Sequence, residues 1–343
     1  MAAVNLKSYP FTQGSFNIRR ASLSVVTPAV TAGPIKASHF NVVAGQTLMA
    51  ATSVQDAAVK VGHLWGTGYG DRGYGMTSPV LVTKEAGQPV TSADWIALRT
   101  TIANLITWQD STFAVVPALN LFDAGDSIIA SEPNQLSQAA DIMDNRRLSY
   151  LLANMTLTSN AVTTSRMGPW GTFPISCILS FELPSEDQMR YFFNSGGDVR
   201  ISFNHPSTVT GQNARWAGVL NTLLLVFTAN RTVQIDGGQY YGLDKEIGYY
   251  QLTESWQTIY DGMNMSAYVT GSNDVLIEAR STFIAGFRGA KGRVIEFKVS
   301  LNNDDPAAVD DLLVSGTSIS LSHLRATTTI VIPTPTCTVV EPI

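Results

Sequence analysis

The hydrophobic pattern of the chain changes near Met167, and this change constrains the fold more than any other feature. Before it, apolar residues recur at helical spacing, whereas after it β-branched and apolar residues alternate with polar ones. The later part predicts short strands separated by turns rich in Gly, Asn and Asp. We therefore expect an α+β fold in which an N-terminal helical portion precedes a β-rich, sandwich-like domain with two inserted helices.

The β-rich part carries ten predicted strands and two predicted helices. The strands are Ile175–Leu183, Val199–Asn204, Leu224–Thr228, Thr232–Ile235, Ile247–Leu252, Met265–Val269, Val275–Ser281, Val294–Leu301, Ser318–His323 and Thr327–Ile332. The helices are Glu186–Asn194 and Gln212–Asn221. Gly196-Gly197 ends the first helix, because a left-handed residue at that point is cheapest as glycine. Phe192 and Phe193 are its expected core anchors.

The helical part contains three regions of helical spacing. Residues 36–62 carry one signal, Trp95 to Trp108 form an apolar stripe that Ser92 or Asp94 caps, and a further helix runs from Pro133 to about Met155. We expect Arg146 and Arg147 in the middle of that last helix, facing solvent or a partner.

These patterns divide the chain into four segments. Residues 1–35 form an extended N-terminal arm, 36–165 a mainly helical domain with a Gly/Tyr loop, 166–332 the β-rich domain and 333–343 an extended C-terminal tail. The proline-spaced tail is a natural donor for the sheet edge of a neighbouring subunit. Both ends read equally well as frayed termini.

Composition narrows the class of protein. Charged residues make up 14% of the chain, against roughly 25% in an average soluble domain. Such a surface favours burial against neighbouring subunits, and a neutral secreted or β-rich protein is the plainer alternative. The net charge of −5 and the absence of a basic stripe argue against direct nucleic-acid binding.

Cysteine usage and hydropathy give further expectations. Cys177 and Cys337 lie far apart in the sequence and are interpreted as free thiols. The longest apolar run, near Leu223–Phe227, is far shorter than the ~20 residues of a membrane span. No apolar signal segment is visible near Met1, so we expect synthesis in the cytoplasm of the producing cell.

Gly68, Gly70 and Gly73 satisfy the spacing G-x-G-x-x-G within the segment Trp65–Gly75. Such a loop cradles phosphate only between a strand and a helix. Here a predicted helix precedes it and an apolar run follows Pro79. We expect an ordered loop that packs its aromatic side chains against a neighbour.

Chemically active patterns are few, and we predict no catalytic, cofactor-binding or metal-binding residue. The four histidines, His39, His63, His205 and His323, are isolated in the sequence, and we expect His205 to be a hydrogen-bonding surface residue. The carboxylates that could include a glycosidase pair are Glu132, Asp141, Asp144, Glu182, Glu254 and Asp261.

An oxygen-rich segment and a group of aromatic residues can each be interpreted as a binding site or as an ordinary part of the fold. The oxygen-rich segment 302–306, with Asp310-Asp311, could bind Ca²⁺ but lacks EF-hand spacing and is simpler as a turn before a short helix. The aromatics Tyr240-Tyr241, Tyr249-Tyr250, Trp256 and Tyr260 could bind sugars or proteins. We favour a core position for Trp256 and Tyr260, with the tyrosine pairs alternating across a strand.

The segment from Ser185 to Phe227 carries a resemblance to a known family. Its Phe192-Phe193-Asn194-Ser195-Gly196-Gly197 element and the later Gly211-Gln212-Asn213-Ala214-Arg215-Trp216 resemble a recurring piece of structural proteins of tailed bacteriophage virions, including those of T4-like cyanophages. The glycine–tyrosine loop followed by an Asp94-Trp95 helix is similar to the N-terminal part of those proteins. The resemblance covers most of residues 36–230.

That resemblance implies a virion structural protein of the tail, neck or fibre region. Its expected partners are copies of itself, as a trimer or ring, and other virion proteins, and its expected location is the virion. Two rivals stay open. A receptor-binding or carbohydrate-binding tail appendage predicts exposed aromatics, and a virion-associated glycan hydrolase predicts two carboxylates about 5–10 Å apart in a cleft.

Overall fold

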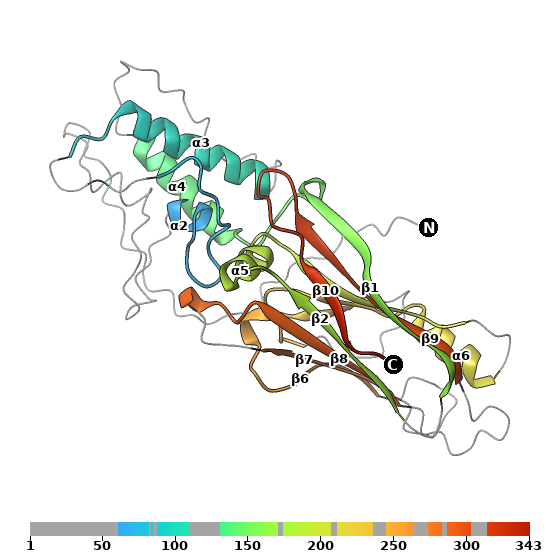
Figure 1. The fold of residues 1–343 in the computed structure, drawn as a ribbon. Helices are drawn as coiled ribbons and strands as arrows, with labels where there is room; N and C mark the ends of the chain where they lie inside the picture. Colours follow the sequence, from blue (N-terminus) through green and yellow to red (C-terminus); the bar gives the residue numbers. More distant parts are fainter. Residues whose placement is uncertain are drawn as a thin grey trace.

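The fold is a β-rich body with a small group of helices at one end (Figure 1). The computed structural model describes residues 61–81, 84, 88–109, 131–170, 174–206, 211–235, 245–263, 274–282, 287–302 and 314–343. The helical group contains α2 (Val61–Trp65), α3 (Ser92–Gln109) and α4 (Ser131–Asn145). No helix in these ranges is long and apolar enough to cross a membrane.

Ten strands form two antiparallel sheets of five. The first has the order β1 (Met155–Trp170), β9 (Val314–Ala326), β3 (Asp198–Asn204), β4 (Leu224–Phe227) and β5 (Thr232–Ile235). The second has the order β10 (Thr336–Glu341), β2 (Ile175–Glu182), β8 (Val294–Asn302), β7 (Asp274–Ser281) and β6 (Gln257–Met263). Helix α5 (Glu186–Asn194) faces the helical group, and α6 (Gly211–Leu220) lies at the opposite end (Figure 1).

The two sheets pack face to face through alternating apolar side chains. In β7 and β8 every second residue is buried, which is the period that a strand with one buried face requires. Aromatic contacts cross between the sheets: the rings of Phe227 and Phe297 lie 5.3 Å apart, and those of Phe181 and His323 lie 5.9 Å apart. The arrangement is consistent with the predicted β-sandwich.

Helix α5 is bounded by sequence-encoded caps. The Ser185 side chain accepts a hydrogen bond from the backbone N–H of Gln188 at 3.2 Å, which satisfies one of the free donors of the first turn. Gly196 follows the helix with φ of 83°, as predicted for a left-handed stop. Phe192 and Phe193 are fully buried and confirm their predicted role as core anchors.

Helix α3 confirms the predicted apolar stripe. Trp95, Leu98, Ile102, Leu105 and Trp108 are all buried. The cap differs slightly from the prediction, because Thr91 occupies the cap position. The backbone N–H of Thr91 donates to Asp94 at 2.7 Å and the Asp94 N–H donates back to Thr91 at 3.4 Å, so Asp94 completes a reciprocal cap.

Six predicted strands agree closely with β2, β3, β4, β5, β7 and β8, and the predicted Ser318–His323 lies inside the longer β9. Two predictions are wrong. Residues 247–252 contain a short 3-10 helix, η3 (Tyr249–Gln251), whose two tyrosines both contact the interior instead of alternating across a strand. Residues 327–332 reverse the chain after β9, with Thr327 bridged to Val331. The predicted strand 265–269 lies outside the described residues.

Strand β1 was not predicted, and the β-rich part begins at Met155 instead of residue 166. The predicted third helix correspondingly ends at Asn145. Two register shifts against β9, one between Thr158 and Val162 and one between Arg166 and Pro169, interrupt the alternation in β1. Because few of its side chains are buried, a period of two was not visible in the sequence.

The C-terminal tail is extended, as predicted, but it pairs within its own chain. Strand β10 runs antiparallel to β2, with Thr336 opposite Glu182 and Val339 opposite Leu179. The tail therefore completes a sheet of its own subunit instead of being donated to a neighbour. Cys177 in β2 and Cys337 in β10 are both free thiols, as predicted.

Residues 1–60 lie outside the described part of the chain. The predicted arm at 1–35 and nearly all of the helix predicted at 36–62 therefore stay predictions. Only the end of that helical signal is described, as α2, whose Val61 and Leu64 are buried.

A matched pair of isoleucines in α3 tests the packing of this helix. Ile102 is fully buried, whereas Ile96 is 41% exposed. Ile102→Ala is expected to lower the free energy of unfolding by about 2–5 kcal/mol through lost burial and a residual cavity. Ile96→Ala should lower it by less than about 1 kcal/mol. Urea unfolding followed by circular dichroism measures both, and equal losses would contradict the orientation of α3.

The buried His323 predicts a pH dependence of stability. Burial, with a smaller contribution from Arg325, lowers the pKa of His323 to about 4. Its pKa in the unfolded chain is about 6.5, so between these values the unfolded chain binds the extra proton. The free energy of unfolding should therefore fall as the pH decreases from about 6.5 to about 4.

His323→Phe keeps an aromatic ring beside Phe181 and removes the titration. It should flatten that part of the pH dependence by up to about 3 kcal/mol. Urea unfolding of both proteins at several pH values between 4 and 7.5 is the measurement. An unchanged pH slope in the variant would show that His323 does not titrate with folding.

Candidate functional site

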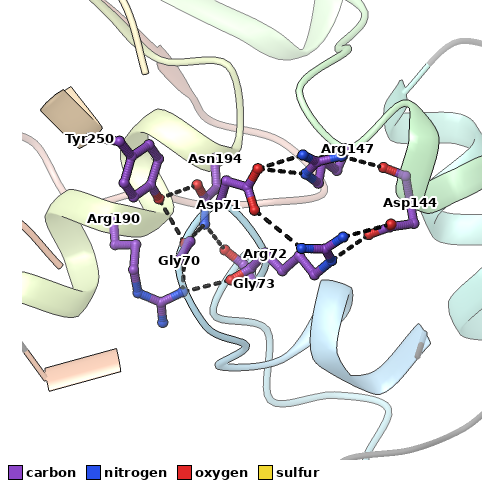
Figure 2. Close-up of polar contacts among 9 residues, drawn as sticks. All are labelled: Gly70, Asp71, Arg72, Gly73, Asp144, Arg147, Arg190, Asn194 and Tyr250. Atoms are coloured by element: carbon purple, nitrogen blue, oxygen red, sulfur yellow. Dashed lines mark hydrogen bonds and ion pairs between the residues drawn. The ribbon is translucent and has the colours of Figure 1, made fainter. Parts of the chain in front are cut away.

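The most concentrated group of polar contacts lies where the glycine–tyrosine loop meets α5 and α4 (Figure 2). We call this group the loop clamp; it consists of Gly70, Asp71, Arg72, Gly73, Asp144, Arg147, Arg190, Asn194 and Tyr250. The loop leaves α2 and turns back, with the Tyr74 N–H donating to the Leu64 carbonyl at 2.9 Å. No strand precedes it within the described residues.

Arg190 of α5 holds the loop from one side. Its side chain is fully buried, and its guanidinium donates to the carbonyls of Thr67, Gly70 and Arg72, the last two at 3.2 and 2.6 Å. Asp187, one turn earlier, accepts from the same guanidinium at 3.0 Å. An arginine suits this position because its planar group offers five donors in fixed directions.

Asn194 and Tyr250 complete this half of the clamp. The Asn194 amide donates to the carbonyls of Gly70 and Gly73 at 3.1 and 3.0 Å. The Tyr250 hydroxyl lies 2.6 Å from Asn194 Oδ1 and 2.7 Å from the Gly70 carbonyl. Burial, with the nearby Tyr249, raises the pKa of Tyr250 well above its usual value, so the hydroxyl stays a donor at neutral pH.

The other half of the clamp is a set of ion pairs between the loop and the end of α4. Arg72 binds both carboxylate oxygens of Asp144, at 2.7 and 2.9 Å, and Arg147 binds Asp71. Burial opposes the charge of Arg72, but its hydrogen bond and charge interaction with Asp144 raise the pKa of Arg72 above its ordinary value. Bidentate pairs of this kind fix orientation as well as distance.

The predicted position of Arg147 in the middle of a helix is wrong. It was expected in mid-helix, facing solvent or a partner, but α4 ends at Asn145 and Arg147 lies in the following turn. There its side chain reaches Asp71, and its backbone carbonyl accepts a hydrogen bond from the Tyr74 hydroxyl at 2.5 Å.

The loop does not have the chemistry of a phosphate site. A phosphate-binding loop presents backbone N–H groups to the anion. This loop instead directs the carbonyls of Thr67, Gly70, Arg72 and Gly73 towards donors of α5. Gly73 has φ of 107°, and a Cβ there would lie 2.3 Å from the Thr67 carbonyl oxygen, so glycine is required for the loop to close. The loop is held by α5 and α4 of its own chain, and the expected packing of its aromatic side chains against a neighbour stays a prediction.

The predicted surface position of His205 is wrong. It is buried and not on the surface: its two ring nitrogens lie 3.0 Å from Thr317 Oγ1 and 3.1 Å from Asn213 Oδ1. Burial lowers the pKa of His205. These contacts tie the end of β3 to α6 and β9, which is a structural role.

Three of the six candidate carboxylates, Glu132, Asp141 and Asp144, lie on α4, whereas Glu182 and Asp261 lie on β2 and β6 and Glu254 lies between η3 and β6. Asp144 belongs to the loop clamp, Glu182 of β2 lies 3.5 Å from Arg293, and Asp261 lies on the edge strand β6. Within the described ranges, no three His, Cys, Asp or Glu side chains gather as a set of metal ligands would. His39 and the oxygen-rich segment 303–311 lie outside those ranges.

The aromatic candidates divide in a similar way. Tyr260 is buried, as predicted. Trp256 was expected in the core but is half-buried, with Arg280 lying 4.3 Å from the centre of its ring and Lys298 6.0 Å from it. Tyr249 and Tyr250 point inward, and Tyr240-Tyr241 lie outside the described residues.

The clamp can hold two parts of the fold together, and its donors and acceptors are directed at the chain's own backbone and ion-pair partners. Sequence reasoning missed it, although Arg190 and Asn194 sit four residues apart on a helix whose neighbouring face is aromatic. Two polar side chains at helical spacing beside a buried stripe are the signal that could have indicated a buried polar contact.

Replacement of Arg190 tests the clamp. Arg190→Met keeps the length of the side chain but leaves the carbonyls of Thr67 and Arg72 without this donor and removes one of the three donors to the Gly70 carbonyl. We expect the free energy of unfolding to fall by about 3 kcal/mol or more. Cleavage of the segment 66–75 by a protease should also become faster.

Arg280→Met is the matched control. Arg280 lies on the outer face of β7, is 35% exposed and pairs with Glu296 at 2.7 Å. An exposed pair contributes about 0–1 kcal/mol, so this variant should unfold nearly as the parent does. Urea unfolding compares the two variants, and equal destabilisation would refute a special role for Arg190.

Comparison of the chain with protein-family models, with curated proteins and with solved structures gives no match.

Proposed function

We propose that this chain is a virion structural protein of a tailed bacteriophage, which assembles into the tail, neck or fibre region. It does so through contacts with copies of itself, as a trimer or ring, and with other virion proteins. The proposed fold is α+β, with an N-terminal helical portion, a sandwich-like β domain and two inserted helices. The resemblance of residues 36–230 to such phage proteins supports the class.

The observation that carries the proposal is the loop clamp. It uses a buried arginine, an asparagine and two alternating Arg–Asp pairs to hold a loop, and the donors of Arg190 and Asn194 are directed at backbone carbonyls. A catalytic site needs polar groups that converge on a space for substrate. Polar groups that lock a loop in place instead suit a rigid building block.

The charge distribution supports the same reading. Only 14% of residues are charged, and many charged side chains in the described ranges are already paired within the chain. Examples outside the clamp are Arg200–Asp198, Arg280–Glu296 and Lys298–Glu278. The low fraction of charged residues lowers the cost of burying surface between subunits, which favours association.

The two rival functions gain little support. A sugar stacks on an open aromatic face, but Trp256 already has Arg280 over its ring. A glycan hydrolase needs one carboxylic acid and one carboxylate within reach of a single bond. Asp144 and Glu182 both have arginine partners, and they belong to different elements.

Mass measurement of the purified chain tests the proposal. Native mass spectrometry is expected to show a trimer or a ring, and incubation with host polysaccharide should release no sugars. Immunogold labelling should place the protein on the neck, tail or fibres of phage particles. A stable monomer that cleaves polysaccharide would overturn the proposal in favour of the hydrolase.

A further inference from the structure

Strand β10 is held on the sandwich mainly by its backbone. Its register with β2 runs from Thr336 opposite Glu182 to Val339 opposite Leu179. None of its six residues is buried, and within the strand Cys337 and Val339 cover the core only in part. In β7, by contrast, every second residue is buried. A segment with few buried apolar contacts opens at a low free energy, so β10 can leave β2 while the other strands stay paired.

The edge of β2 needs a strand beside it. In the described chain β2 lies between β10 and β8, and its Leu179 and Phe181 are fully buried. Without β10, the backbone N–H and C=O groups along one side of this core strand would lose their partners. Exposed edges of apolar strands readily pair with other chains. The edge of β2 is therefore an acceptor whose occupant the structure identifies as the segment Thr336–Glu341 (Figure 1).

A short linker with two prolines, Pro333-Thr334-Pro335, carries β10. Each proline fixes its own φ and restricts the residue before it to extended conformations, so the linker is stiff. The turn before the linker belongs to the sandwich, because Ile330 and Ile332 are buried and the Ile332 N–H donates to the Ala326 carbonyl at 3.1 Å. The linker and β10 can therefore move as one arm whose base stays fixed. Short hinges favour the exchange of a terminal element between identical chains.

We propose that in the assembly β10 of each subunit pairs with β2 of the next subunit, an inference that rests on the proposed function and names the contact that joins its subunits. In a single chain β10 pairs with its own β2. In an assembly every neighbour presents an identical edge, with the same register and the same inward positions for Cys337 and Val339. Exchange therefore replaces each contact of β10 with an equal one.

The geometry of the exchange agrees with a trimer or a ring. The donor is β10 and the acceptor is the edge of β2, so each contact joins two different surfaces of the subunit. Head-to-tail contacts of this kind close into rings when the rotation between subunits permits it. The arriving strand covers the edge that the departing strand has exposed, so a closed ring leaves no β2 edge unpaired.

A disulfide between β2 and β10 tests the inference. Ser180 and Thr338 lie directly opposite each other. Opposed residues of antiparallel strands have Cα atoms about 4.5–5.5 Å apart, which a disulfide can span. Ser180→Cys and Thr338→Cys are combined with Cys337→Ser, which removes the neighbouring thiol, and the assembled protein is oxidised. On a denaturing gel without reductant, most of the chain is expected to shift from the monomer to covalent multiples, and reductant should reverse the shift.

Thr163→Cys with Ser320→Cys is the matched control, also combined with Cys337→Ser. The two hydroxyls lie 2.8 Å apart on the neighbouring strands β1 and β9, which take no part in the exchange. This pair should link within one chain and run as a monomer. Circular dichroism and native mass spectrometry establish that both variants fold and assemble as the parent does.

Three results would overturn the inference while leaving the proposed function in place. The first is an assembled sample in which the pair at positions 180 and 338 gives linked monomers only. The second is free thiols at both positions after oxidation, and the third is covalent multiples from the control pair in the same proportion. A parent chain that is monomeric at every concentration would overturn both the inference and the proposed function.

Discussion

The contact of Arg190 with the glycine loop is the interaction on which the arrangement of the helices and the sandwich depends. A fully buried guanidinium is tolerated only when its donors are satisfied, and here three backbone carbonyls and Asp187 satisfy them. Because these acceptors belong to a loop that follows α2, the position of α5 on the sandwich determines the position of the helical group. Removal of the arginine would leave the carbonyls of Thr67 and Arg72 without this donor.

The remainder of the junction follows from this contact. Once the loop is held by α5, Asp71 and Arg72 face the end of α4, where Asp144 and Arg147 bind them. Tyr74 then reaches the Arg147 carbonyl and accepts a hydrogen bond from Gln109 of α3 at 3.1 Å. Charged groups are thereby used to join elements of one subunit.

Sequence patterns predicted the helices and strands that bury one face, because the buried side chains of these elements recur at a regular spacing. Alternation in β7 and β8 and the stripe of α3 follow directly from a buried face. The same reasoning failed for β1, because an edge strand with two register shifts has few inward side chains. It also failed at Tyr249-Tyr250, where two adjacent β-formers both turn inward in a 3-10 helix.

The candidate site was less accessible to sequence analysis than the fold. The glycine spacing was visible in the sequence, but the residues of α5 and α4 that hold the loop were not. Arg190 binds backbone carbonyl groups, which every residue possesses. The residue types of the loop therefore do not predict the contact. Likewise, β10 was recognised as extended, but nothing local in Thr336–Glu341 distinguishes pairing with β2 from pairing with another chain.

The order of the strands has a consequence for how the chain is made. Strand β9 lies between β1 and β3, and β10 covers the edge of β2, so both sheets incorporate strands from the end of the chain. These strands are synthesised after the other strands of both sheets. During synthesis β1, β2 and β3 therefore exist for a time without the strands that pair with them in the complete fold. A topology dominated by such long-range pairing folds slowly. The complete set of strand pairs can therefore form only after β9 and β10 have been synthesised.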